Sequence, residues 1–125
     1  MLNESTHLLV VNKLLDVYEI HNILTIPSSE NRYNISFYCG NNMYKVFEQI
    51  LVTDSLDNKI VYIVDLNLNI IPLVLSGMKY NVDSNIIECS FELFNTLVID
   101  KQQLFNTILK SNVDKKWKQL IIEVV

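Results

Sequence analysis

The feature that most constrains the fold is a strict alternation of apolar and polar residues in two separate segments. On one side of residues 32–39 lie Tyr33, Ile35, Phe37 and Cys39, and on one side of residues 86–94 lie Ile87, Cys89, Phe91 and Leu93. A period of two is typical of a β-strand that buries one face and exposes the other. These two segments therefore predict a sheet with one apolar and one polar face.

Further apolar runs indicate additional strands. Residues 59–65 are apolar on both faces, as in a central strand, and residues 70–75 form a second such run. Pro72 cannot donate a ladder hydrogen bond, which predicts that its strand is bulged or lies at a sheet edge. Residues 43–52 fit a strand, with helix as the alternative over 44–51. Short connections, which favour antiparallel pairing, are indicated at residues 27–31, 40–42, 54–58, 67–69 and 83–85.

Apolar residues spaced three and four apart predict helices at both ends of the chain. A helix over about residues 5–19 would align Leu8, Leu9, Val11, Leu14, Leu15 and Tyr18. Asp100 is expected to cap a helix over residues 101–110, whereas residues 113–125 fit either helix or strand. The sequence thus predicts one α+β domain over residues 1–125. It is expected to be an antiparallel meander sheet of about five or six strands, with an N-terminal helix and one or two C-terminal helices packed on one face.

Composition excludes several classes of protein. The chain has 125 residues, half of them hydrophobic, with only two glycines and two prolines, so it is too apolar for intrinsic disorder. No apolar run approaches the ~20 residues of a membrane-spanning helix. The first residues lack the pattern of a secretory signal, and we expect a cytoplasmic protein. In that compartment Cys39 and Cys89 are expected to be free thiols within strands.

The sequence contains no recognisable catalytic motif. The sequence contains no glycine-rich phosphate loop, no strand-turn-helix serine nucleophile motif and no paired zinc ligands at short spacing. Its two histidines, His7 and His21, lie fourteen residues apart. We therefore predict no catalytic residues, no cofactor and no metal.

Charge is distributed unevenly along the chain. Its net charge is −4, but residues 1–100 contain five basic and twelve acidic residues, a balance of −7. Lysines are concentrated in residues 101–118, and Arg32 is the single arginine. Proteins that bind nucleic acid are usually basic overall and use arginine to recognise phosphate and guanine. We therefore expect no direct contact with nucleic acid.

Acidic residues offer the best candidate binding surface. Glu88, Ser90 and Glu92 alternate with apolar residues, so they are predicted to project together from the polar face of the sheet. The two carboxylates would lie about 13 Å apart, which is too far for a hydrolytic pair. We predict instead a partner-binding surface made of Glu88, Glu92, Asp83, Asp57 and Asp54.

These features favour a binding protein over an enzyme. We expect a small acidic protein that neutralises a basic protein partner, in the form of an immunity protein or inhibitor of a bacterial nuclease toxin. One alternative is a small enzyme whose site is built from dispersed carboxylates. Another is an assembly subunit that associates through an exposed apolar strand edge. Neither a nucleic acid nor a membrane is expected as a partner.

Overall fold

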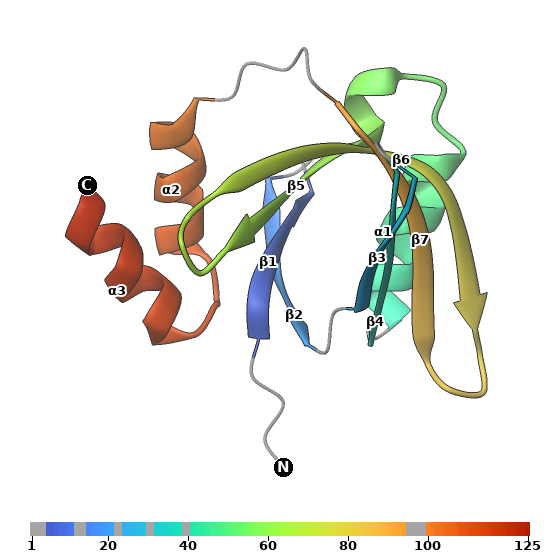
Figure 1. Ribbon diagram of the computed structural model, residues 1–125, viewed down its shortest axis with the longest axis horizontal. Helices are drawn as coiled ribbons and strands as arrows, with labels where there is room; N and C mark the ends of the chain where they lie inside the picture. The colour runs from blue at the N-terminus through green and yellow to red at the C-terminus, as the bar shows by residue number, and fades with distance from the viewer. Residues whose placement is uncertain (1–4, 12–14, 22–23, 30–31, 39–40, 95–99) are drawn as a thin grey trace.

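A computed structural model describes residues 5–11, 15–21, 24–29, 32–38, 41–94 and 100–125. Seven strands form one antiparallel sheet in the order β2-β1-β5-β6-β7-β4-β3. Within these residues, three α-helices and one short 3₁₀ helix, η1, accompany the sheet (Figure 1). The bounds are β1 Ser5–Val11, β2 Asp16–His21, β3 Leu24–Ser29, β4 Arg32–Tyr38, α1 Asn41–Leu51, η1 Leu56–Lys59, β5 Ile60–Asp65, β6 Ile70–Asn81, β7 Ile86–Leu93, α2 Lys101–Lys110 and α3 Lys115–Val124.

The structure confirms the predicted α+β class and the antiparallel sheet. Strands β5, β6 and β7 follow one another as a meander through its centre, flanked by the β1–β2 and β3–β4 hairpins. The sheet has seven strands, because β1, β2 and β3 arise where the sequence indicated helix and loop. The loop predicted at residues 27–31 is strand as far as Ser29, and residues 30 and 31 lie outside the described residues.

The helix predicted over residues 5–19 is wrong. Residues 5–11 and 16–21 are β1 and β2, and the helix in the N-terminal half is α1. Strand β1 lies between β2 and β5, with both of its faces buried. Leu8 and Val10 face one apolar cluster, whereas Leu9 and Val11 face another. An apolar run that is buried on both faces carries no alternation, so its periodicity resembles that of a buried helix.

Residues 43–52, for which the sequence allowed strand or helix, are helical as far as the end of α1 at Leu51. Met43, Phe47 and Ile50 are buried and recur at the spacing of a helical face. They pack against apolar residues of β1, β4, β5, β6 and β7. Phe47 belongs to this first cluster and has no exposed surface.

The sequence predicted that the helices pack on one face of the sheet, but they pack on both faces. Helix α1 joins the first cluster, and helices α2 and α3 join a second cluster with Leu8, Val10, Ile60, Tyr62 and Val64. Successive residues of β1 and β5 alternate between the two clusters, which therefore lie on opposite faces of the sheet. Cys89 is buried in the first cluster, and Cys39 lies outside the described residues.

Strand β6 is an interior strand, so Pro72 does not mark a sheet edge. Pro72 pairs with Tyr62 of β5, and its carbonyl accepts a hydrogen bond from the Phe94 amide at 3.1 Å. The Pro72 nitrogen points to the same side as its carbonyl. On that side it faces residues that follow the end of β7 at Leu93, so the missing N–H disrupts no pair of the β6–β7 ladder. A register shift between Leu75 and Gly77 shows that the strand is bulged.

The sheet is strongly curved. Its edge strands β2 and β3 are consecutive in sequence, and only two residues separate His21 from Leu24. Those strand ends therefore lie within about 11 Å of each other, although five strands lie between them in the sheet. Figure 1 shows β6 arching across both halves of the sheet.

The C-terminal helices begin where the sequence indicated. The Asp100 carboxylate accepts hydrogen bonds from the Gln102 and Gln103 amides at 3.0 and 3.2 Å, which confirms the predicted N-cap. Residues 113–125, left open between helix and strand, contain α3. Trp117 and Ile121 lie on the buried side of α3 and have no exposed surface.

Candidate functional site

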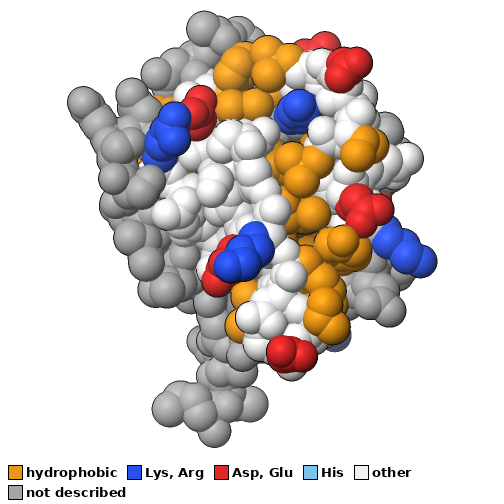
Figure 2. Space-filling model, turned by 90° about the vertical axis from the view of Figure 1, so that its right-hand side faces the viewer, with side chains coloured by type: hydrophobic (Ala, Val, Ile, Leu, Met, Phe, Trp, Pro, Cys, Tyr) orange, Lys and Arg blue, Asp and Glu red, His pale blue; other side chains and the backbone are white. Residues whose placement is uncertain are grey.

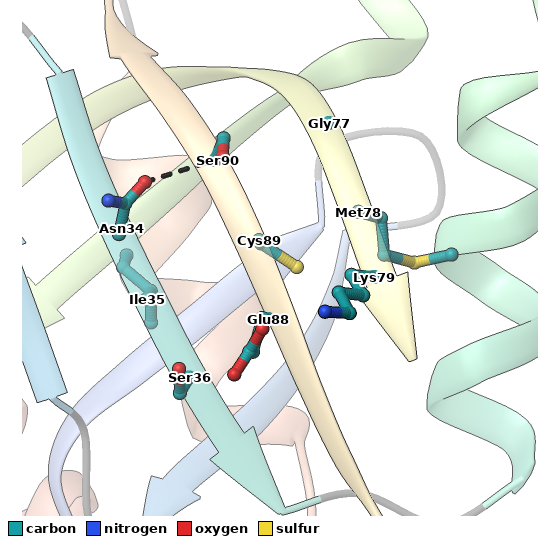
Figure 3. A pocket seen from close by; sticks show the side chains of 9 residues that line it. All are labelled: Asn34, Ile35, Ser36, Gly77, Met78, Lys79, Glu88, Cys89 and Ser90. Carbon is teal, nitrogen blue, oxygen red and sulfur yellow. Dashed lines mark hydrogen bonds between the residues drawn. The ribbon is translucent and has the colours of Figure 1, made fainter. Parts of the chain in front are cut away.

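Helices α2 and α3 cover only part of their face of the sheet. They pack over β1, β2, β5 and the start of β6. The same face of β4, β7 and the rest of β6 contains a hollow of about 560 Å³ that is open to solvent. Figure 3 shows the strands and side chains that form it. We call this region the open face, and its outward residues are Arg32, Asn34, Ser36, Gly77, Lys79, Glu88, Ser90 and Glu92.

Small side chains account for the hollow. In register across the three strands, Asn34 lies beside Ser90, and Ser90 lies beside Gly77. The Ser90 hydroxyl donates to Asn34 Oδ1 at 3.3 Å, and the Ser76 hydroxyl donates to the Ser90 carbonyl at 3.0 Å. This row projects less than the charged rows on either side of it. The bulge before Gly77 and the glycine itself leave the middle of the open face low.

Glu88 and Glu92 project from β7 onto the open face, while Cys89 and Phe91 between them are buried. The alternation of apolar and polar residues therefore predicted correctly that both side chains project from the polar face of the sheet. The register places Lys79 opposite Glu88 and Arg32 opposite Glu92. An Arg32 nitrogen lies 3.0 Å from Glu92 Oε1. The open face is thus a mixed-charge surface rather than an acidic strip.

Figure 2 shows the same mixture on the side of the molecule that carries the β6–β7 hairpin and α1. Acidic and basic side chains are interspersed there, several in neighbouring pairs, around a band of apolar side chains. The remaining three predicted residues are all exposed but lie elsewhere. Asp83 is in the turn between β6 and β7, whereas Asp54 and Asp57 lie in the segment between α1 and β5. The five predicted residues therefore do not form one continuous patch.

A second hollow, of about 690 Å³, lies between β2 and the turn that joins α2 to α3. Its lining residues are Val17, Tyr18, Glu19, Asn112, Val113 and Asp114. The Glu19 carboxylate accepts a hydrogen bond from the Asp114 amide and so holds the start of α3 against β2. Burial, together with Asp16, raises the pKa of Tyr18. No sequence pattern indicated this contact, because its partners lie 95 residues apart.

His7 and Asp65 face each other on the paired strands β1 and β5. Burial lowers the pKa of His7, although Asp65 opposes that shift. Burial alone would raise the pKa of Asp65, yet hydrogen bonds from Asn69 and Asn67 and the nearby His7 hold it below its usual value. The three hydrogen bonds to its carboxylate measure 2.9, 2.9 and 3.0 Å. Both groups are therefore stabilised in the forms present at neutral pH.

These shifts predict that acid destabilises the fold in two stages. Below the unfolded-state histidine pKa of 6.5, the unfolded chain binds a proton at residue 7 more readily than the folded chain does. The free energy of unfolding should therefore fall as the pH decreases from about 7 to about 5. A second decrease, due to Asp65, should follow as the pH passes below its unfolded value of 3.8. Urea denaturation across this pH range measures both stages.

The variant His7→Gln tests the assignment of the first stage. It should flatten the dependence of the unfolding free energy on pH above pH 5 and leave the acidic stage in place. An unchanged slope between about pH 7 and 5 in this variant would contradict the role given to His7.

Comparison with known proteins adds no relative. No family model, no curated protein and no solved structure matches this chain. Across the described residues, histidines, cysteines and carboxylates form no group of three or more that could hold a metal ion. No helix in the described part of the chain is long and apolar enough to cross a membrane. The fold and the open face together define an α+β protein with a curved antiparallel sheet, one part of which is left uncovered.

Proposed function

We propose that this chain binds a basic protein through its open face and thereby neutralises that partner. The observation that supports this proposal is the unequal covering of the sheet. Helices α2 and α3 shield one part of the face, while β4, β7 and most of β6 present a hollow of about 560 Å³. An interface needs such a surface, with polar groups at its rim and room for a partner's side chain.

Polar groups in the hollow can recognise cationic side chains. The amide of Asn34 and the hydroxyls of Ser36 and Ser90 offer hydrogen-bond acceptors beside the Glu88 carboxylate. Arginine and lysine side chains carry several donors, so they suit a surface of this composition. Asp83, at the β6–β7 turn, adds an exposed carboxylate at the end of the strand that carries Glu88.

The ion pair on the open face does not prevent this role. The Arg32 and Glu92 side chains are 64% and 43% exposed, so their ion pair contributes only about 0–1 kcal/mol. Lys79 is also exposed opposite Glu88. A partner's arginine can therefore replace either cation at little cost. Such exchangeable charges affect the association rate and the choice of partner more than the final affinity.

We propose further that the partner is a nuclease toxin and that the chain acts as its immunity protein in a bacterial cytoplasm. Enzymes that act on nucleic acid carry basic surfaces, which an acidic chain complements. Purifying the tagged chain from its native host should recover one basic protein in equal amount. Adding the chain to that protein should abolish its nuclease activity. An acidic companion, or an unchanged nuclease activity, would rule out this form of the proposal.

Reversing one charge tests the open face directly. The variant Glu88→Lys should slow association with the purified partner about tenfold at low ionic strength, within the range seen among variants of one interface. The difference should shrink at high salt because exposed charges are screened. Stopped-flow or biosensor kinetics would measure it, and circular dichroism would verify folding. The control Glu123→Lys changes an exposed carboxylate on α3 by the same amount and should associate at the normal rate.

Equal association rates for Glu88→Lys and the unsubstituted chain at low salt would contradict binding through the open face. A loss of folding in Glu88→Lys would contradict the exposure of this side chain. The new lysine would lie beside Lys79, but repulsion between two exposed charges costs under about 1 kcal/mol.

A further inference from the structure

Exposed apolar side chains concentrate in two segments on opposite faces of the sheet. Among the described residues, seven large apolar side chains are exposed, and five of them lie in residues 52–57 and 120–125. The first segment contributes Val52, 77% exposed, and Leu56, 51% exposed. The second contributes Ile122, Val124 and Val125, exposed by 57%, 63% and 61%. Single exposed apolar residues are ordinary, but grouped ones mark interaction surfaces.

Charged side chains lie beside both segments, and the balance of charge differs in sign. Carboxylates outnumber lysines near the first segment, whereas on α3 the lysines Lys115, Lys116 and Lys118 outnumber Asp114 and Glu123. Asp54 and Asp57 lie among the apolar residues of the first segment, which joins α1 to β5, and both are exposed. Glu48 lies exposed one helical turn before Val52, so three carboxylates stand here against Lys45 and Lys59. We call residues 52–57, with Glu48, the acidic end.

On α3 two lysines and two exposed apolar residues form one stripe, in which Lys118 is half-buried. Lys115, Lys118, Ile122 and Val125 follow one another at spacings of three and four, which places them along one side of the helix. Trp117 and Ile121 occupy the buried side. Three lysines stand at the start of α3, after Asp114 at its N-cap, and the first turn itself has no acidic residue. We call this stripe the basic end.

The two ends cannot meet within one molecule. The acidic end extends from α1, which packs in the first apolar cluster, and the basic end lies on α3, which packs in the second. Figure 1 shows α3 and the segment after α1 on opposite sides of the molecule. Contact between the two ends therefore requires another copy of the chain.

We propose that the acidic end of one copy docks on the basic end of another, so that copies associate head to tail. Val52 and Leu56 contact Ile122 and Val125, and Asp54 and Asp57 lie near Lys115 and Lys118. Because the two surfaces differ and lie on opposite sides, each contact leaves one free surface at either end. The product is an open chain of copies rather than a closed symmetric dimer. This contact does not involve the open face.

Sedimentation velocity of the purified full chain tests the proposal. At about 0.02 M ionic strength the weight-average sedimentation coefficient should rise steadily with protein concentration, without a plateau at the dimer. At about 0.5 M the rise should be largely lost, because the charges are screened. A monomer at every concentration and both salts, or a discrete dimer, would overturn the proposal.

Two neutralising variants sharpen the test. In Lys115→Gln/Lys118→Gln the basic end is disabled, and in Asp54→Asn/Asp57→Asn the acidic end is disabled. Neither variant should self-associate at low salt. Their mixture should form a 1:1 dimer and stop there, since each variant keeps one working surface. Self-association of either variant alone, or no dimer in the mixture, would contradict head-to-tail docking.

Matched substitutions separate this contact from general charge effects. The control Lys79→Gln/Lys101→Gln removes two exposed lysines that lie outside both ends and should associate as the unsubstituted chain does. The variant Ile122→Ser should lower the association constant about tenfold or more, because it removes a large apolar contact. Equal weakening in the lysine control would show that net charge alone drives association. None of these measurements involves the basic partner, so the self-association and the proposed inhibitory function can fail independently.

Discussion

Replacing Trp117 with alanine is expected to lower the free energy of unfolding by about 3–5 kcal/mol. Trp117 has no exposed surface and anchors α3 in the second apolar cluster. Its loss would leave a cavity between α3 and the strands, because the neighbouring backbone can relax only in part. Domains of this size are stable by about 5–15 kcal/mol, so the variant should lose a third or more of that margin. Urea denaturation followed by circular dichroism measures the change.

The milder variant Trp117→Phe separates packing from hydrogen bonding. Among the described residues, the indole Nε1 of Trp117 is buried and has no hydrogen-bond partner. Phenylalanine removes this donor while keeping an aromatic ring, so we expect a loss below about 1.5 kcal/mol. A loss in Trp117→Phe as large as that in Trp117→Ala would show that the indole N–H is satisfied in solution. A loss under about 1 kcal/mol in Trp117→Ala would contradict its burial.

Replacing Phe47 with alanine is expected to cost a similar ~3–5 kcal/mol, but on the other face of the sheet. Phe47 attaches α1 to the first cluster, where it is fully buried with Ile35, Leu75 and Phe91. The control Lys45→Ala lies on the exposed side of the same helix and should change stability by less than about 0.5 kcal/mol. Equal effects of the two substitutions would contradict the orientation of α1.

The two clusters also predict additivity. Phe47 and Trp117 share no cluster, and the sheet lies between them. The conservative pair Phe47→Leu and Trp117→Phe should therefore add to within about 0.3–0.5 kcal/mol in the double variant. A larger coupling energy would show that the two faces of the sheet respond as one core.

Elements whose identity depends on short-range pattern were predictable. Strands β4 and β7 alternate strictly, since one face of each is polar and the other is buried. Helix α2 has its Asp100 cap and an apolar stripe that includes Leu104 and Ile108. The outward direction of Glu88 and Glu92 follows from the same alternation. In each case the local chemistry agrees with the final environment.

Prediction failed where burial on both sides removed the pattern. The run Leu8–Val11 is buried on both faces of β1, so nothing in its spacing distinguished strand from helix. Leu15, between β1 and β2, adopts a φ of 50°, a conformation that leucine rarely takes and that no turn signal announced. Pro72 predicted a strand at an edge or with a bulge. The strand is bulged between Leu75 and Gly77 but interior, because a missing donor does not reveal which neighbour it faces.

The sequence alone determined the mixed α+β class, the polar face of β7 and the uneven distribution of charge, because each depends on residues close together in the chain. Only the tertiary structure decided which part of the sheet the C-terminal helices cover, and hence where the open face lies. It also decided that Lys79 and Arg32 stand beside the predicted carboxylates, and that the acidic and basic ends lie on opposite sides of the molecule. Strand order and register bring together residues far apart in sequence, and no local pattern encodes that pairing.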